Sequence, residues 1–413
     1  MESTMTLSKK TLLLCLAAVL AWLPTARAAE RIDTTKQSSA SKPVADTAQI
    51  DTIESSVQWS IDPRTGEVTT GSRSTGSGGT STGTSDDEIA TPVILPYDFF
   101  DAEDNGMSSL NSYFLSQLSM GVYSDALSGT AFRQDLIDRF TPQGIPADGI
   151  DVIMDAISGS EAAAFRIGNA TVIAFRGTSA EGTLTPERDA EVDLLDVPIK
   201  VKLNDKECRV HQGFWESADA VFDWVAGHAR SAHNAGRKVF LTGHSLGAAR
   251  ATVCAARLHY DENIPVQSLQ TFGSPKVGDV QFRSILGDVG PDGIKLAEVT
   301  ERFVVLGDPA TTFPDKEAIW ENWKTPTIIY YEHVGNTHNI NPLTGTNSAH
   351  YEILFDSGEI FFVPTASQWI GFLSGAGDNE HMLYDDALLH EVINDPMYIE
   401  IKDLLIEYES VEQ

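Results

Sequence analysis

The fold of this chain is decided by residues 238–260, which read KVFLTGHSLGAARATVCAARLHY. Lys238 to Thr242 predicts a strand, and Ala248 to Tyr260 predicts a buried helix. Between them stands Gly243-His244-Ser245-Leu246-Gly247, a serine flanked by glycines that leave room where strand and helix come close. Such a turn exposes the serine hydroxyl and directs helix amide dipoles toward a forming anion. Ser245 is therefore the candidate nucleophile; the alternative is a glycine-rich turn with an incidental serine.

Helices alternate with short β-branched runs from Val93 onward, the pattern of an α/β fold with a mostly parallel sheet flanked by helices. Residues 93–413 therefore predict one catalytic domain. We expect helices at Met107 to Val122 and Gly213 to Asn234. The expected strands are two within Ala164 to Phe175, joined at Gly168-Asn169, then Gln267 to Phe272, Glu301 to Val305, Thr327 to Tyr331, and a hairpin over Tyr351 to Phe362 that turns at Asp356-Ser357-Gly358.

Two segments precede this domain. Lys9 and Lys10 come before an apolar run that ends in small residues, which predicts a cleaved signal peptide over residues 1–28 rather than a membrane anchor. Residues 29–92 predict a disordered, flexible linker rich in Ser, Thr and Gly, in which only Val57 to Ile61 could form a strand. The chain should be exported, to an extracellular or periplasmic location.

The net charge of −30 argues against nucleic acid as a partner and against standing attraction to acidic membranes. Two cysteines follow the signal peptide, Cys208 and Cys254, and an exported chain of this length does not need disulfides, so we expect no structural bridge. The histidines are scattered rather than paired at ligand spacing, and no calcium-loop pattern is present. We expect no metal and no cofactor; the sequence leaves the oligomeric state open.

A serine hydroxyl needs a base within hydrogen-bond reach and a carboxylate that orients the base. In a fold with this turn, the acid and then the histidine follow the serine along the chain. Asp308 follows a strand and is the candidate acid, with an Asp-Pro turn of no catalytic role as the alternative. The candidate bases after it are His333, His338, His350, His381 and His390.

Several separated motifs, in this order, resemble the class 3 (fungal-type) lipase family of the α/β-hydrolase superfamily. They are FRGT at 175–178, HQGF at 211–214, GHSLGAA at 243–249, TFGSPKVGD at 271–279, and the acid at Asp308 followed by Pro309. The resemblance covers about residues 105–390. Lys276 and Asp279 depart from the family's usual Arg and Asn, which should affect local packing more than chemistry.

The resemblance favours His381 as the base, because its setting looks like the late HxxY of the family. It implies that His333 is structural, and His390 falls on an apolar helix over Ala387 to Ile393. It also implies that the backbone amides of Thr178 and Leu246 form the oxyanion hole, in which one donor typically contributes about two to three powers of ten in rate. We expect Arg176 and His211 to brace the site loops.

The implied activity is a secreted serine ester hydrolase, a triacylglycerol lipase or carboxylesterase, that acts on an ester or lipid substrate through an acyl-enzyme and has no stable membrane span. A phospholipase A or an aryl-ester esterase stays an alternative, and a non-catalytic lipid-binding protein is the alternative of another class. The family's lid would be Ser179 to Glu191, which is poor in apolar residues and predicts weak interfacial activation. Either of two apolar groups could line an acyl cleft or be ordinary core: Phe313, Trp320 and Trp323, or Trp369, Ile370, Phe372 and Leu373.

Overall fold

The structure of the protein is a computed structural model. It describes residues 57–61, 68–72, 97–124, 126–178, 197–319, 326–343, 350–360 and 380–394, with a few positions between 362 and 368. All of them lie in the unit Ser56–Gln413. The predicted signal peptide, the lid segment and six of the seven acyl-cleft candidates fall outside the described residues.

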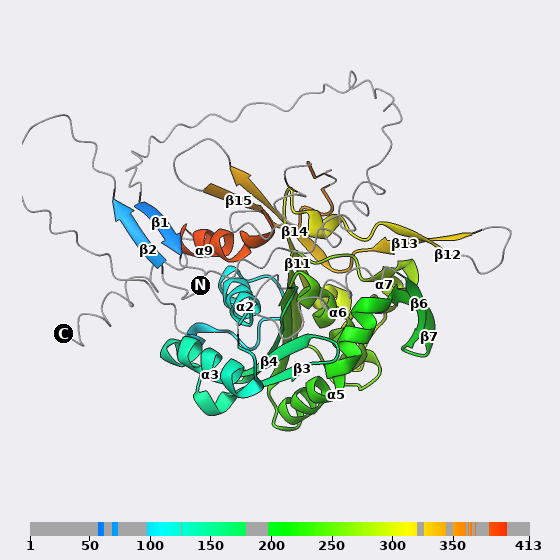
Figure 1. Ribbon diagram of the computed structural model, residues 1–413, viewed down its shortest axis with the longest axis horizontal. Helices are drawn as coiled ribbons and strands as arrows, with labels where there is room; N and C mark the ends of the chain where they lie inside the picture. Colours follow the sequence, from blue (N-terminus) through cyan, green and yellow to red (C-terminus); the bar gives the residue numbers. More distant parts are fainter. Residues whose placement is uncertain are drawn as a thin grey trace, which may run out of the picture. The chain divides into compact units, whose positions relative to one another are not determined.

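An eight-stranded sheet forms the centre of the fold, with the order β15-β14-β11-β9-β8-β5-β4-β3 (Figure 1). The neighbours from β14 to β5 pair in parallel, whereas β3, β4 and β15 join through antiparallel pairs. The strands are β3 Ile150–Asp155, β4 Ser160–Ile167, β5 Ala170–Phe175, β8 Lys238–His244, β9 Ser268–Phe272, β11 Thr300–Val305, β14 Asn336–Leu343 and β15 His350–Leu354.

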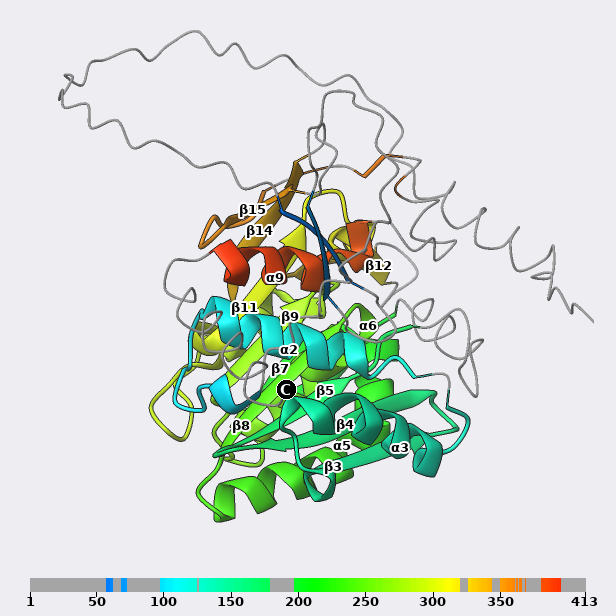
Figure 2. The same cartoon turned by 90° about the vertical axis from the view of Figure 1, so that its left-hand side faces the viewer.

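Helices cover both faces of this sheet (Figure 2). One face packs against α2 Ser109–Gly121, α3 Gly129–Phe140 and α9 Tyr384–Asn394, and the other against α5 Gln212–Asn234, α6 Leu246–Tyr260 and α7 Val280–Leu286. The side chains of β8 alternate between the two cores, because successive side chains of a strand point to opposite faces of the sheet. Val239 and Leu241 enter the core beneath α5 and α6, and Phe240 enters the core beneath α2. Burial on both faces explains why the central strands read as continuous apolar runs.

A second, smaller sheet has the strand order β12-β13-β10-β7-β6, and all of its neighbouring strands are antiparallel. Its strands are β6 Pro198–Leu203, β7 Lys206–His211, β10 Gly278–Asp279, β12 Lys316–Ile319 and β13 Thr327–Glu332. A separate pair joins β1 Val57–Ile61 to β2 Val68–Ser72. Short 3₁₀ helices complete the described elements: η1 Tyr97–Phe99, η2 Thr141–Gln143, η3 Ala147–Gly149, η4 Leu296–Val299, η5 Pro309–Thr312 and η6 Glu380–Met382.

The structure confirms the α/β class and most of the predicted elements. The helices α2, α5 and α6 and the strands β4, β5, β8, β9, β11 and β13 lie within a few residues of the predicted bounds, and Val57 to Ile61 is a strand. Cys208 and Cys254 are both free and buried, which confirms that they form no bridge.

The predicted hairpin over Tyr351 to Phe362 is wrong. The strand β15 ends at Leu354 and pairs with β14, so that Asn339 faces Leu354 and Leu343 faces His350. The polar sequence of β14, NTHNINPL, gives no apolar signal for a strand, so its pairing with β15 could not be anticipated. The turn after β15 is instead held by Asn339, whose side-chain amide donates hydrogen bonds to Ser357 Oγ and to the Gly358 carbonyl.

Within the segments described, no helix combines the length and the apolarity required to cross a bilayer.

Candidate active site

Ser245 occupies a strained turn between β8 and α6. Its φ of 58° and ψ of −129° lie in a region that non-glycine residues rarely adopt, and such strain is typical of functional sites. Its amide donates a 2.9 Å hydrogen bond to the Phe272 carbonyl at the end of β9. The two flanking glycines are required by close backbone contacts. A Cβ on Gly243 would lie 2.4 Å from the Gly247 carbonyl, and one on Gly247 would lie 2.1 Å from the Phe175 carbonyl oxygen.

The FRGT segment passes directly beside this turn. A Cβ on Gly177 would lie 2.6 Å from the His244 carbonyl oxygen and 3.1 Å from Ser245 Cβ. Thr178 follows in the chain, and Leu246, which is buried, is the first residue of α6. The structure therefore brings the two segments that carry the predicted oxyanion-hole amides close to the serine.

Asp308 and His381 meet although 73 positions separate them in the sequence. His381 Nδ1 lies 2.9 Å from both carboxylate oxygens of Asp308, which is fully buried. Gly273, after β9, comes close to both groups: a Cβ there would lie 2.9 Å from Asp308 Oδ2 and 3.1 Å from His381 Nδ1. Ser245, Gly273 and Asp308 follow β8, β9 and β11, and the carboxyl ends of adjacent parallel strands meet at one edge of the sheet.

Two further donors hold the Asp308 carboxylate. Tyr384 donates its hydroxyl to Oδ2 at 2.6 Å, and the Ala310 amide donates to Oδ1 at 2.9 Å. The Tyr384 oxygen also accepts a hydrogen bond from the Val305 amide, and burial beside Asp308 raises the pKa of Tyr384 well above its usual value. Tyr384 thus stays neutral and is a permanent donor to the acid. The sequence pointed to it only as the final residue of the HxxY pattern, without a role.

The ring of His244 lies 4.3 Å from the ring of His381, centroid to centroid. Because His244 precedes Ser245 in the chain, this contact places the nucleophile segment and the predicted base side by side. Sequence reasoning gave His244 and its hydrogen-bond partner Tyr123 no role. The one available signal was the position of His244 inside the turn motif itself.

The other candidate histidines have different surroundings. His333 is buried, its Nε2 lies 2.8 Å from the Thr311 carbonyl, and burial holds its pKa well below the usual value. Its contact with the turn after Asp308 agrees with the structural role predicted for it. His338 lies on β14, where Nε2 lies 2.6 Å from Glu301 Oε2. His350 and His390 lie on β15 and α9.

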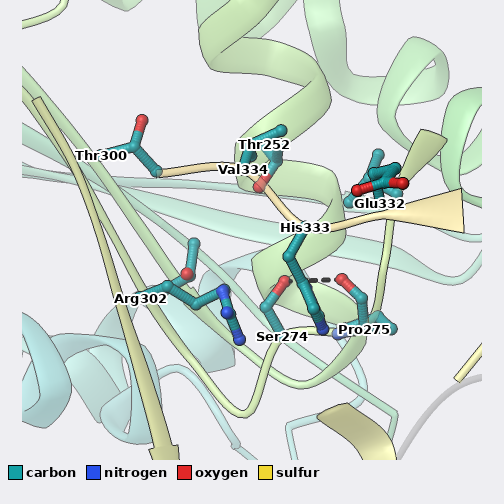
Figure 3. A pocket seen from close by; sticks show the side chains of 10 residues that line it. Thr252, Ser274, Pro275, Thr300, Arg302, Glu332, His333 and Val334 are labelled. Atoms are coloured by element: carbon teal, nitrogen blue, oxygen red, sulfur yellow. Dashed lines mark hydrogen bonds between the residues drawn. The ribbon is translucent and has the colours of Figure 1, made fainter. Parts of the chain in front are cut away.

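A small pocket lies behind the Asp308 turn, where Figure 3 shows His333 reaching toward the Ser274–Pro275 segment, with Arg302 on the other side. Thr252, Thr271, Thr300 and Glu332 also line it. The pocket includes none of Ser245, Asp308 and His381. It is therefore a feature of the packing behind the acid and not the place where an ester would bind.

Among the described residues, one group of side chains has the spacing of metal ligands: Glu301, His338 and Asp356, whose ligand atoms lie within 4.8 Å of one another. Its hydrogen bonds argue against a metal. His338 Nδ1 accepts from the Asp356 amide, so the proton of a neutral ring sits on Nε2 and is donated to Glu301. Glu301 also accepts a hydrogen bond from the side-chain amide of Asn336. Glu301 and His338 already form a hydrogen bond with each other, which a metal ion would have to break.

Arg176 and His211, which we expected to brace the site loops, are both buried. Arg176 forms a buried 2.6 Å ion pair with Glu161, and its carbonyl accepts a hydrogen bond from Arg250 of α6. His211 stacks on Phe214 with ring centroids 3.9 Å apart, and burial lowers its pKa to about 3. It is therefore neutral and does not titrate near neutral pH. Phe313, an acyl-cleft candidate, packs against the core beneath α5 and α6 instead.

Comparison with known proteins agrees with these motifs. Residues 172–317 match the family described as lipase (class 3). The secreted mono- and diacylglycerol lipase 1 of Fusarium solani is 43% identical over 82 residues, which are 19% of this chain and 24% of that protein, so the chain spans about a quarter of the length of this curated relative.

Solved structures with a similar fold include a triacylglycerol lipase whose catalytic centre is described as a serine protease triad. It is 21% identical, with 60% of this chain and 85% of that chain covered and a TM-score of 0.43. The Rhizomucor miehei lipase, in a complex with its propeptide, is 19% identical, with 69% and 80% covered and a TM-score of 0.41. The family match agrees with the resemblance seen in the motifs: residues 172–317 of this chain are similar to the class 3 lipases.

Proposed function

We propose that this protein is a secreted carboxylic ester hydrolase, a lipase or carboxylesterase, with Ser245 as nucleophile, His381 as base and Asp308 as the acid that orients the base. The observation that carries the proposal is the buried Asp308–His381 contact at the same sheet edge as the strained Ser245 turn. A histidine that is oriented by a carboxylate and lies beside a serine is the arrangement that activates a serine hydroxyl. The family match of residues 172–317 supports an ester or lipid as the substrate.

The reaction follows from the hydrogen bonds. His381 donates Nδ1–H to Asp308, so the lone pair of the neutral ring is on Nε2. Nε2 takes the proton of the Ser245 hydroxyl while the oxygen attacks the ester carbonyl carbon. The amides of Thr178 and Leu246 stabilise the oxyanion that forms. Collapse expels the alcohol, which receives the proton from Nε2, and water then hydrolyses the acyl-enzyme by the same steps.

Three donors to the buried acid make this arrangement suitable for catalysis. During attack His381 becomes a cation, and a carboxylate that is already oriented stabilises it without rearrangement. The acid is held by His381, Tyr384 and the Ala310 amide, so its position is defined before the substrate arrives.

Neutral esters fit the electrostatics better than anionic surfaces do, because the chain carries a net charge of −30. The relative from Fusarium solani is named as a mono- and diacylglycerol lipase, which supports neutral acylglycerols as a substrate class. Phospholipids and aryl esters remain the alternative substrates. A sharp rise in rate when the substrate passes from monomers to an emulsion would contradict the weak interfacial activation that the polar lid segment predicts.

The test is hydrolysis of p-nitrophenyl esters from short to long acyl chains by the chain starting at Ala29. We compare wild type with Ser245→Ala and His381→Ala, and with His333→Gln as the matched control. Both triad variants should lose several powers of ten in kcat, about 10⁴-fold to 10⁶-fold, whereas the control should keep most of its activity. If His381→Ala keeps its rate, the base is His333 or His350. If wild type is inert on every ester, with a phospholipid assayed beside the p-nitrophenyl series, the chain is a lipid-binding protein instead.

We also propose the organisation of the whole chain: a signal peptide over residues 1–28, a linker over 29–92 and a catalytic domain over 93–413, with export from the cell. The signal peptide is supported by the basic and apolar pattern around Lys9 and Lys10. Mass spectrometry of the protein recovered outside the producing cells tests this proposal. A mature protein that begins at Ala29 is expected, and an intact Met1 in an exported, membrane-bound form would contradict cleavage.

A further inference from the structure

His244 connects the nucleophile turn to the loop that carries the base. Its Nε2 lies 2.7 Å from the carbonyl oxygen of His381, and its Nδ1 lies 2.8 Å from the hydroxyl of Tyr123. Both His244 and His381 are buried, and their rings are in contact. The contact joins β8 to η6, two elements 137 positions apart in the sequence.

The partners determine the proton positions on this ring. A carbonyl oxygen only accepts, so the His244 Nε2 must carry a hydrogen. Burial, together with the nearby His381, holds the pKa of His244 well below its usual value, so the ring is neutral. Its Nδ1 is then an acceptor, and Tyr123 donates its hydroxyl to it. Tyr123 thereby selects the one tautomer of His244 that can donate to His381.

We propose that Tyr123 and His244 are positioning residues that hold the main chain of His381 and so set the distance between Ser245 and its base. This inference rests on the proposed function. Neither side chain needs to exchange a proton with the substrate. The pair acts through His381, whose backbone is tied to β8 by His244 while its ring is tied to the β11 side by Asp308. Anchored at two points, the base keeps one orientation toward the serine.

Gly177 leaves room for the hydrogen bond between Tyr123 and His244. A Cβ on Gly177 would lie 2.1 Å from the Tyr123 hydroxyl, so only glycine allows this hydroxyl to reach His244. Tyr123 lies two residues after the end of α2, whose last turn is largely buried. The hydroxyl therefore comes from a fixed scaffold, as a positioning group requires.

The matched control is His259, a buried histidine near the end of α6, the helix that begins directly after Ser245. Its Nε2 lies 3.2 Å from the Ile294 carbonyl, and its Nδ1 accepts from the Val266 amide. The bonding pattern is the same as that of His244, with Nε2 on a carbonyl and Nδ1 as an acceptor. The difference is that His259 lies at the far end of α6 and bonds to no part of the base loop.

The experiment measures kcat and KM on a soluble p-nitrophenyl ester for Tyr123→Phe, His244→Leu, His244→Gln and His259→Leu, in the chain starting at Ala29. We expect His244→Leu to lower kcat about 10²-fold with KM unchanged, the loss typical of a misplaced reacting group. Glutamine keeps a donor near the Nε2 position and should recover part of the loss. Adding Tyr123→Phe to His244→Leu should cause no further loss, because both act through the same contact.

A spectroscopic measurement keeps the proposal testable if His244→Leu does not fold. In the full chain labelled with ¹⁵N-histidine, the His244 ring should show a bonded, slowly exchanging Nε2–H, and Tyr123→Phe should weaken or shift it. A ring proton on Nδ1 would overturn the proposal. So would a kcat of His244→Leu and Tyr123→Phe equal to that of His259→Leu. Failure of the proposed function is distinct, since Ser245→Ala would then keep the wild-type rate.

Discussion

Replacing Tyr384 by phenylalanine removes one of the three donors to the buried Asp308 and changes little else. The hydroxyl donates to Asp308 Oδ2 at 2.6 Å and accepts from the Val305 amide at 3.1 Å, so both partners lose a hydrogen bond. A hydrogen bond to a charged group contributes about 1.5–3 kcal/mol to stability. We therefore expect the free energy of unfolding to fall by about 1.5–3 kcal/mol, since the carboxylate has no exposure to water that could replace the donor.

The effect on catalysis should be smaller than on stability. The Tyr384 bond is present in the free enzyme and in the transition state, so most of its free energy cancels in kcat. The part that remains is the looser orientation of Asp308, which still accepts from His381 and Ala310. We expect kcat to fall about tenfold, which corresponds to about 1.4 kcal/mol, with KM unchanged.

The assay combines urea denaturation with steady-state hydrolysis of a p-nitrophenyl ester. The matched control is Tyr260→Phe, whose buried hydroxyl donates to the Leu286 and Asp288 carbonyls and lies far from the triad. It should lose stability and keep its kcat. The reasoning would be refuted if Tyr384→Phe kept the kcat and stability of wild type, or if both variants lost kcat to the same extent.

Three further predictions concern single sites. Gly177→Ala should abolish hydrolysis in the same ester assay, because its Cβ would lie 2.6 Å from the His244 backbone oxygen; activity near that of wild type would contradict the tight approach of the two loops. Asp385 of α9 accepts a hydrogen bond from Gln117 of α2. Burial raises the pKa of its carboxyl group from the ordinary 3.8 to about 6. Its contribution to the free energy of unfolding is therefore present below about pH 4 and is lost as the pH rises through 6. Asp385→Asn should therefore raise Tm at pH 7.5 and change it little at pH 4, and an equal shift at both values would disprove the assignment. Burial raises the pKa of the thiols of Cys208 and Cys254 to about 12, so iodoacetamide should leave both unmodified in the folded protein at pH 7.5, as mass spectrometry would show.

Local backbone requirements made the candidate nucleophile turn predictable. A strand, a turn with two glycines and a helix are written within residues 238–260, and the contacts that exclude a Cβ at Gly243 and Gly247 come largely from this stretch and the neighbouring FRGT segment. The long amphipathic helix α5 was predictable for the same reason, because its buried residues recur every three to four positions. In both cases the deciding information lies close together in the chain.

Strands that depend on distant partners were less predictable. The pairing of β14 with β15 buries polar residues whose hydrogen bonds come from elsewhere, such as His338 with Glu301, and the sequence shows no alternation that would announce it. The antiparallel pair β6–β7 was also missed. Val201 of β6 faces Cys208 of β7, and both side chains pack against a core built mostly from α5 and α6. The burial of these strands therefore depends on helices that follow later in the chain.

By itself the sequence determined the fold class, the candidate serine, the candidate acid and the small number of histidines among which a base would be sought. The motifs of the class 3 lipases narrowed that number toward His381, but residue spacing alone could not. Only the tertiary structure decided that His381 meets Asp308, that Tyr384 donates to this carboxylate, and that His244 contacts both Tyr123 and the His381 main chain. The physical reason is that a helix or a glycine turn follows from interactions between near neighbours, whereas these contacts exist only after the order of the strands has brought distant segments to one edge of the sheet.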